Sequence, residues 1–222
     1  MKKYGKCILQ GSLWLLAALS FVVLGLGVYS NQVMKDLKDN IVRLHVVADS
    51  DIQEAQDLKL KVRDSVTAYT KDILQGSSDA KESYGILQAH IDEIQKVAEA
   101  RARVEGCDLP VSATLGEFEF PVKSYGDISL PSGLYNAVKV TIGSGEGKNW
   151  WCVLFPPLCF VDSENAAVSA SGRVQMEESL SSESYDVIQN EPEEGKIKIK
   201  FKIVDFFESI AQKARGSWTN LF

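Results

Sequence analysis

The sequence predicts an α+β fold, with a mostly antiparallel sheet, a two-helix hairpin packed on one face of that sheet, and an N-terminal apolar helix. Three observations support it: a charge-free run near the N-terminus, two consecutive segments with helical periodicity, and several later segments with strand character. The chain has 222 residues, 45% hydrophobic and 24% charged, which fits one medium-sized globular domain. Its net charge of −6 argues against nucleic-acid binding, which needs a concentrated basic surface.

Residues 1–30 are predicted to be a signal peptide or a membrane anchor. A run without charged residues follows three lysines and extends from Cys7 to Met34, long enough to span a bilayer. Gly25 and Gly27 offer a small-residue pair for signal peptidase, but no Ala-x-Ala motif is present, so both alternatives stay open. In either case the lysine end stays in the cytosol and the rest of the chain is exported.

The segment after the leader predicts a linker, a buried strand and a helix. Residues 31–40 are taken as the linker, and the β-branched run at residues 41–48 predicts the strand. Ser50 and Gln53 form a capping-box pattern, so a helix is expected to begin at once. One apolar stripe runs along this helix: Ala55, Leu58, Val62, Val66, Tyr69 and Ile73.

A second helix is predicted after the break at residues 76–78. Asp79 and Glu82 repeat the capping-box pattern, and Gly106 is well placed to end the helix. Two consecutive helices joined by a short loop favour an antiparallel hairpin laid against a sheet.

The sheet is predicted from residues 111–122, 135–142 and 150–155. The last of these runs is continuously apolar and predicts a central strand covered on both faces. The glycine-rich segment between the last two runs predicts a hairpin turn. It does not fit a phosphate-binding loop, because Ile142 and Asn149 stand where that motif needs a glycine and a hydroxyl residue.

The C-terminal third divides into two further segments. Residues 163–195 are rich in serine and carboxylates, which predicts a flexible acidic segment. Residues 196–203 alternate between lysine and apolar side chains, which predicts a half-buried edge strand, and a helix is expected at residues 206–214. The predicted domains are therefore 1–30, 31–40, an α+β domain at 41–162, 163–195, and a strand and helix at 196–222.

The cysteines and histidines are few. Cys152 and Cys159 flank a proline-containing reversal and are a candidate disulfide, with two buried thiols as the alternative. Neither Cys-x2-Cys nor a paired histidine motif occurs, so no metal or cofactor is expected.

His45 lies in an apolar strand and no Gly-x-Ser-x-Gly elbow is present, so no catalytic residues are predicted. An exported hydrolase with His45 as base, and Cys107 or an acidic residue as its partner, remains the alternative.

Several blocks of the sequence resemble the stage II sporulation protein R family of endospore-forming bacteria. The resemblance covers residues 41–162, and the last block is the most specific. The blocks are residues 44–51 (LHVVADSD), 57–64 (DLKLKVRD), 126–135 (GDIxLPSGxY) and 147–160 (GKNWWCVLFPPLCF).

The resemblance implies an intercellular signal and not an enzyme. Members of the family are exported from the forespore into the space between it and the mother cell. There they trigger a membrane-embedded aspartic protease that processes pro-sigma-E. A third alternative is a membrane-tethered structural protein of the septum. The candidate partner-binding residues, chosen by motif position and chemistry, are His45, Arg63, Asp64, Trp150 and Trp151.

Overall fold

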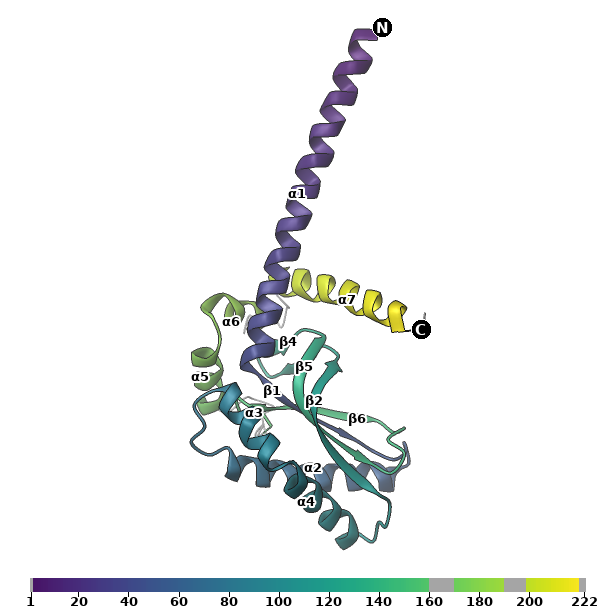
Figure 1. Cartoon of the computed structure of the whole chain (residues 1–222), viewed down its shortest axis with the longest axis vertical. Coiled ribbons are helices and arrows are strands. Elements are labelled where there is room, and N and C mark those ends of the chain that lie inside the picture. The colour runs from purple at the N-terminus through teal and green to yellow at the C-terminus, as the bar shows by residue number, and fades with distance from the viewer. Residues whose placement is uncertain (1, 160–169, 190–198, 220–222) are drawn as a thin grey trace.

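The computed structural model describes residues 2–159, 170–189 and 199–219. Figure 1 shows one long helix projecting from a folded domain. The predicted α+β class is confirmed, including the N-terminal apolar helix and the mostly antiparallel sheet. In chain order the elements are α1 (Lys2–Asn40), β1 (Val42–Val47), α2 (Gln53–Ile73), α3 (Ala80–Ala89), α4 (Ile91–Val104), β2 (Val111–Phe120), β3 (Lys123–Tyr125), β4 (Ile128–Leu130), β5 (Gly133–Ile142), β6 (Asn149–Phe155), α5 (Ala170–Ser179), α6 (Ser182–Ile188) and α7 (Ile199–Thr219).

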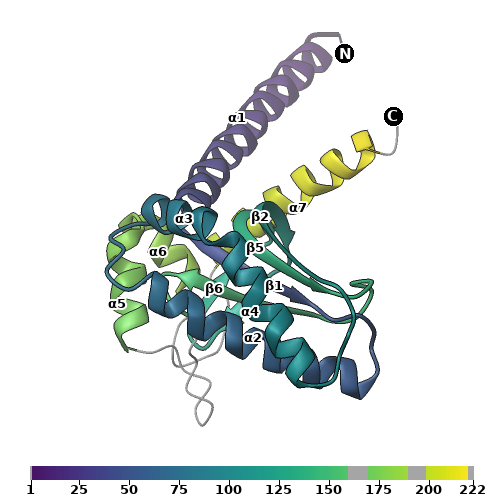
Figure 2. The same cartoon turned by 60° about the horizontal axis from the view of Figure 1, so that its bottom comes forward.

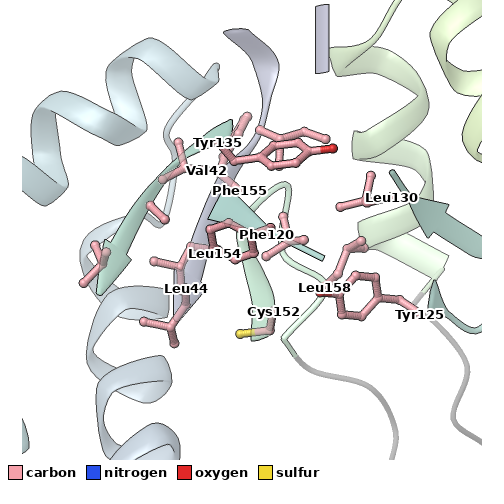
Figure 3. Packing of buried hydrophobic residues seen from close by; sticks show 14 of the residues in the cluster. Val42, Leu44, Phe120, Tyr125, Leu130, Tyr135, Cys152, Leu154, Phe155 and Leu158 are labelled. Atoms are coloured by element: carbon pink, nitrogen blue, oxygen red, sulfur yellow. The ribbon is translucent and has the colours of Figure 1, made fainter. Parts of the chain in front are cut away.

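The main sheet has four strands in the order β2-β5-β1-β6. β1 pairs with β5 in parallel, while β1–β6 and β2–β5 are antiparallel. All six residues of β1 are buried, as the sequence predicts. The expectation that residues 150–155 form a central strand is wrong, because β6 lies at the edge of the sheet. Its apolar run instead reflects burial of side chains: Cys152, Leu154 and Phe155 belong to the core, together with Leu158 from beyond the strand (Figure 3).

Helices α2 and α4 cover one face of the sheet, as Figure 2 shows. This confirms the predicted helix hairpin, although its second helix is divided at His90 into α3 and α4. The capping box before α3 is also confirmed, because Asp79 accepts a hydrogen bond from the Glu82 N–H at 2.7 Å. The prediction of a capping box before α2 is wrong. The residue at that N-cap is Ile52, and no side chain caps the helix.

Residues 31–40 are not a linker but the last part of α1. Val33, Met34 and Leu37 are buried in the domain core. Among the described residues, α1 is the one helix long and apolar enough to cross a membrane. Signal sequence and anchor both remain compatible with this helix, but its C-terminal part is fixed to the domain.

The expectations for the C-terminal third need correction. Within residues 163–195 the structure contains α5 and α6, which bury Met176, Tyr185 and Ile188, so this part is not a flexible segment. Residues 163–169 and 190–195 lie outside the described residues. The strand expected at residues 196–203 is wrong, because α7 begins at Ile199, and residues 196–198 are not described. The lysine alternation is real, but Ile199, Ile203, Phe206 and Ile210 also recur at helical spacing.

Candidate partner-binding site

The five candidate partner-binding residues lie around β6, on the two faces of the sheet. Trp150 and Trp151 are neighbours on β6 and therefore point to opposite faces. His45 on β1 is the register partner of Trp151. On the helix-covered face, the guanidinium carbon of Arg63 lies 4.2 Å from the ring centroid of Trp150. The structure thus brings the candidates together as two groups, His45 with Trp151, and Arg63 and Asp64 with Trp150.

On the face without α2 and α4, an aromatic cluster surrounds two basic residues. We call it the sheet cluster, and its members are Arg43, His45, Phe120, Tyr125, Tyr135 and Trp151. Phe120 contacts Trp151, with ring centroids 4.7 Å apart, and also packs against Tyr135 at 5.8 Å. Trp151 is the partly exposed member, and the other five are buried. The cluster is therefore a rigid support beneath Trp151.

His45 is buried under Trp151 and stacks on its ring, with centroids 3.7 Å apart. Its Nε2 lies 2.6 Å from Oδ1 of Asn149. Because an amide oxygen only accepts, Nε2 carries the hydrogen. Burial lowers the pKa of His45 to about 4, which the bond to Asn149 opposes and the charges of Lys139 and Arg43 reinforce. The ring is therefore neutral near pH 7 and, at 7% exposure, leaves little of its surface for direct contact with a partner.

Arg43 is the central cation of the sheet cluster and is fully buried, at 0% exposure. Its guanidinium carbon lies 4.0 Å from the Phe120 ring centroid and 4.8 Å from that of Tyr135. Its Nη2 donates to the Tyr125 hydroxyl at 2.8 Å. Within the described part of the chain, Arg43 has no carboxylate partner, and its Nε and Nη1 atoms have no hydrogen-bond acceptor. Aromatic ring faces therefore supply most of the compensation for its charge.

Tyr125 connects Arg43 to the edge strand. Its hydroxyl donates to the backbone oxygen of Trp151 at 3.2 Å. Burial raises the pKa of Tyr125 and that of Tyr135, so both hydroxyls stay protonated near neutral pH. The resulting chain from Arg43 through Tyr125 to Trp151 links β1 to the edge strand β6.

On the helix-covered face, Trp150 lies against the cation of Arg63. Arg63 also pairs with Asp64, and its Nε donates to the Asp64 Oδ1 at 2.7 Å. The side chain of Asp64 is 64% exposed, whereas that of Arg63 is 21% exposed. Asp64 therefore presents a carboxylate to solvent beside a partly exposed tryptophan. We give one name, the β6 surface, to the residues around both faces of this edge strand. They are Asn149, Trp150, Trp151, Arg63 and Asp64.

The segment between β5 and β6 is not a hairpin turn as expected, because these two strands are not neighbours in the sheet. It crosses the end of β1 and is held there by carboxylates. Asp49 accepts a hydrogen bond from the Ser144 N–H at 2.8 Å, and Asp51 accepts one from the Lys148 N–H at 2.7 Å. The Gly147 N–H donates to the Ala48 oxygen at 2.9 Å. Asp49 and Asp51 thus fix the start of β6.

Lys59 holds the same segment from α2. Its Nζ donates to the Lys148 oxygen at 3.1 Å and to the Gln56 Oε1 at 2.6 Å. Burial lowers the pKa of Lys59, while the charge of Asp51 opposes this. The motif blocks at residues 44–51, 57–64 and 147–160 therefore meet in one place, around β1, α2 and β6.

Sequence reasoning missed Arg43, Lys59, Tyr125 and Asn149. The available signal for Arg43 was its place two residues before His45 in a buried strand, which puts both side chains on one face. Nothing local indicates Tyr125, because its contacts reach across to β1 and β6.

The structure joins Cys152 and Cys159 by a disulfide with Cα atoms 5.3 Å apart. Cys107 is free and lines a cleft of about 550 Å³ with Leu58 and Lys61, on the helix-covered side. His45 points to the other face of the sheet, so the structure does not bring His45 and Cys107 together. No group of three side chains suited to metal binding occurs among the described residues.

Two comparisons with known proteins find relatives of this chain. The family model for stage II sporulation protein R matches residues 38–165, a span that contains all six described strands and helices α2–α4. A relative from Bacillus subtilis (strain 168), described as "Stage II sporulation protein R", is 31% identical over 189 residues. The alignment covers 78% of this chain and 83% of that relative. No solved structure matches the chain.

Proposed function

Because the chain belongs to the stage II sporulation protein R family, which confirms the resemblance in its motifs, we propose that it is an exported trigger of a membrane-embedded aspartic protease. Membership makes it a sporulation signalling protein. The finer proposal is that the domain leaves the forespore, binds the protease in the mother-cell membrane, and thereby starts processing of pro-sigma-E. In this role the chain binds its partner and performs no catalytic step.

One observation carries the proposal: the family match spans the sheet and helices α2–α4, and the residues of its motifs build the β6 surface and its supports. Trp150 and Trp151 supply partly exposed aromatic rings, and Asp64 an exposed carboxylate. Aromatic side chains on a rigid support are typical anchors of protein interfaces, because little side-chain freedom is lost on binding. Arg43, His45 and Tyr125 provide that rigidity for Trp151.

The direction of α1 also supports the β6 surface as the partner-binding site. Figure 1 shows α2 and α4 at the end of the domain opposite to the N-terminus of α1. If α1 crosses the forespore membrane, the end that bears Arg63 and Asp64 extends away from that membrane. A partner in the facing membrane would meet this end first. Binding activates the protease only if the active state of the protease binds the β6 surface more tightly than the inactive state does.

The test is co-expression of the full chain with the protease and its precursor in a host that does not sporulate. We expect shortened precursor only when all three proteins are present. Asp64→Lys should abolish the shortening and the co-purification of the two proteins. Glu93→Lys, which reverses an exposed charge on α4, is the matched control and should leave both intact. The proposal fails if the precursor is not shortened, or if Asp64→Lys behaves like Glu93→Lys.

A further inference from the structure

Helix α7 is amphipathic, and its apolar face points away from the domain. Its inward side combines the buried Phe201 and Val204 with polar groups. Among these, the Asp205 Oδ1 accepts hydrogen bonds from the N–H of Ser132 at 3.2 Å and from its hydroxyl at 2.7 Å. Arg215 on the same side lies 4.0 Å from the carboxylate of Glu119 on β2. Polar and apolar contacts together therefore attach α7 to the domain.

The outward side of α7 carries large apolar side chains. Ile199, Phe206 and Ile210 are 77%, 61% and 49% exposed, and Ile203 between them is half-buried. Their spacing of four, three and four residues places them in one stripe along the helix. Lys202 and Lys213 are exposed beside this stripe. A surface helix of a water-soluble domain has the opposite arrangement, whereas a helix lying at a lipid surface has this one.

The position of α7 on α1 indicates what covers the stripe. Phe207 packs at Gly27, where an added Cβ would lie 3.5 Å from the phenyl ring. The hydroxyl of Ser30 donates to the backbone oxygen of Val204 at 3.2 Å. These contacts lie where the exposed apolar part of α1 ends, since Val28 is exposed and Ser30 is buried. The apolar surface of α1 therefore continues onto α7.

The length of the charge-free run up to its last exposed apolar residue, Val28, sets the depth of this junction. The 22 residues from Cys7 to Val28 extend about 33 Å as a helix, close to the roughly 30 Å hydrocarbon thickness of a bilayer. A span that begins near Cys7 would end at the level of α7. Figure 1 shows α7 leaving α1 at this level and running across the direction of α1, as a helix lying in the membrane plane would.

We propose that α7 lies on the outer surface of the membrane that α1 crosses, with Ile203, Phe206 and Ile210 among the lipid headgroups and upper acyl chains. Lys202 and Lys213 extend to the phosphates. With α7 on the lipid, the domain has two attachments to the membrane, which fix its orientation. The inference rests on α1 lying in a membrane, as in the proposed function, and not on the identity of the protease.

The test places fluorescent labels on the full chain in vesicles of phosphatidylglycerol and phosphatidylethanolamine. In a Cys7→Ser, Cys107→Ser background, a single cysteine is introduced by Ile210→Cys, Leu19→Cys or Val104→Cys and labelled with an environment-sensitive dye. Val104 is the matched control, because it is an apolar side chain with 77% exposure on α4, far from α7. Quenching by lipids with a nitroxide near the headgroup then reports contact with the membrane surface.

We expect the label at position 210 to be quenched severalfold more strongly than the label at position 104. The label at position 19 should respond to nitroxides deep in the acyl chains, which checks the insertion of α1 separately. Adding Phe206→Asp should return the label at 210 to the behaviour of the label at 104. The inference is overturned if α1 is inserted but labels 210 and 104 behave alike, or if Phe206→Asp changes nothing. It is equally overturned if label 210 is shielded only after a partner membrane protein is added, because the stripe is then a protein interface.

Discussion

The imidazole of His45 lies against the indole of Trp151, with ring centroids 3.7 Å apart and planes 19° from parallel. The His45 ring is buried and the Trp151 ring is partly exposed. The buried ring therefore restrains the tryptophan on the β6 surface. The stack depends on a neutral imidazole, because a charged ring would need solvation that the buried site does not offer. The protonation of His45 should therefore influence both the stability of the domain and the position of Trp151.

Lowering the pH should destabilise the domain through His45. The unfolded chain binds a proton at this residue below its ordinary pKa of 6.5, whereas the folded chain does so only near its pKa of about 4. The unfolded state thus holds more protons between these two values, and stability falls as the pH drops through that window. Between pH 7 and pH 4.5 the loss of stability should be about 2 kcal/mol.

The measurement is the thermal midpoint of the full chain in detergent at pH 7 and at pH 4.5. His45→Phe keeps a ring against Trp151 but cannot titrate, so its midpoint should fall less between the two pH values than that of the natural chain. Equal falls for His45→Phe and the natural chain would contradict the assignment.

Arg43 should tolerate loss of its charge better than loss of its volume. Arg43→Ala leaves a cavity among Phe120 and Tyr135 and an unsatisfied Tyr125 hydroxyl, and should cost about 3 kcal/mol. Arg43→Met fills most of the space without a buried cation and should cost at least about 1.5 kcal/mol less than alanine. Thermal midpoints of the two variants at pH 7 test this ranking. A methionine variant as unstable as the alanine variant would show that the cation itself stabilises the cluster.

Gly147 should not accept a side chain, although no exceptional backbone angle requires glycine there. A Cβ at this position would lie 2.3 Å from the backbone oxygen of Ser50, so the crossing segment would have to move away from β1. Gly147→Ala should therefore destabilise the domain by about 2 kcal/mol. Gly85→Ala is the control: it stands in the exposed part of α3 with nothing within 4 Å, and should stabilise by about 0.5 kcal/mol. Thermal midpoints that move in the same direction for both variants would contradict the close approach of Gly147 to the backbone of Ser50.

The parts of the fold that sequence reasoning predicted are those fixed by local pattern. The apolar run at residues 41–48 and the stripe of α2 need only a neighbouring surface to bury them, so their periodicity was sufficient. The capping box at Asp79 is equally local. The box at Ser50 failed because Asp49 and Asp51 bind the segment at residues 143–148, a partner about 95 residues away along the chain.

The remaining errors have the same origin. The lysine alternation at residues 196–203 fits a strand as well as the start of a helix, and contacts of α7 with α1 decide between them. The apolar run of β6 cannot distinguish a central strand from an edge strand that the core covers. Of the candidate site, the tryptophans and Asp64 lie on the β6 surface, whereas the burial of His45 depends on Phe120 and Trp151 from distant strands.

Loss of the Cys152–Cys159 disulfide should weaken the end of β6. The bridge closes a loop of eight residues, which corresponds to a stabilisation of about 2.5 kcal/mol through the entropy of the unfolded chain. A Cys152→Ala, Cys159→Ala double variant should lower the thermal midpoint by about 5 to 10 °C. Reduction of the natural chain should have a similar effect, whereas Cys107→Ser should respond to reduction as the natural chain does, because Cys107 is free. An unchanged midpoint in the double variant would mean that the hydrogen bond from the Leu158 N–H to the Val153 oxygen, at 3.1 Å, and the burial of Leu158 already hold this reversal without the bridge.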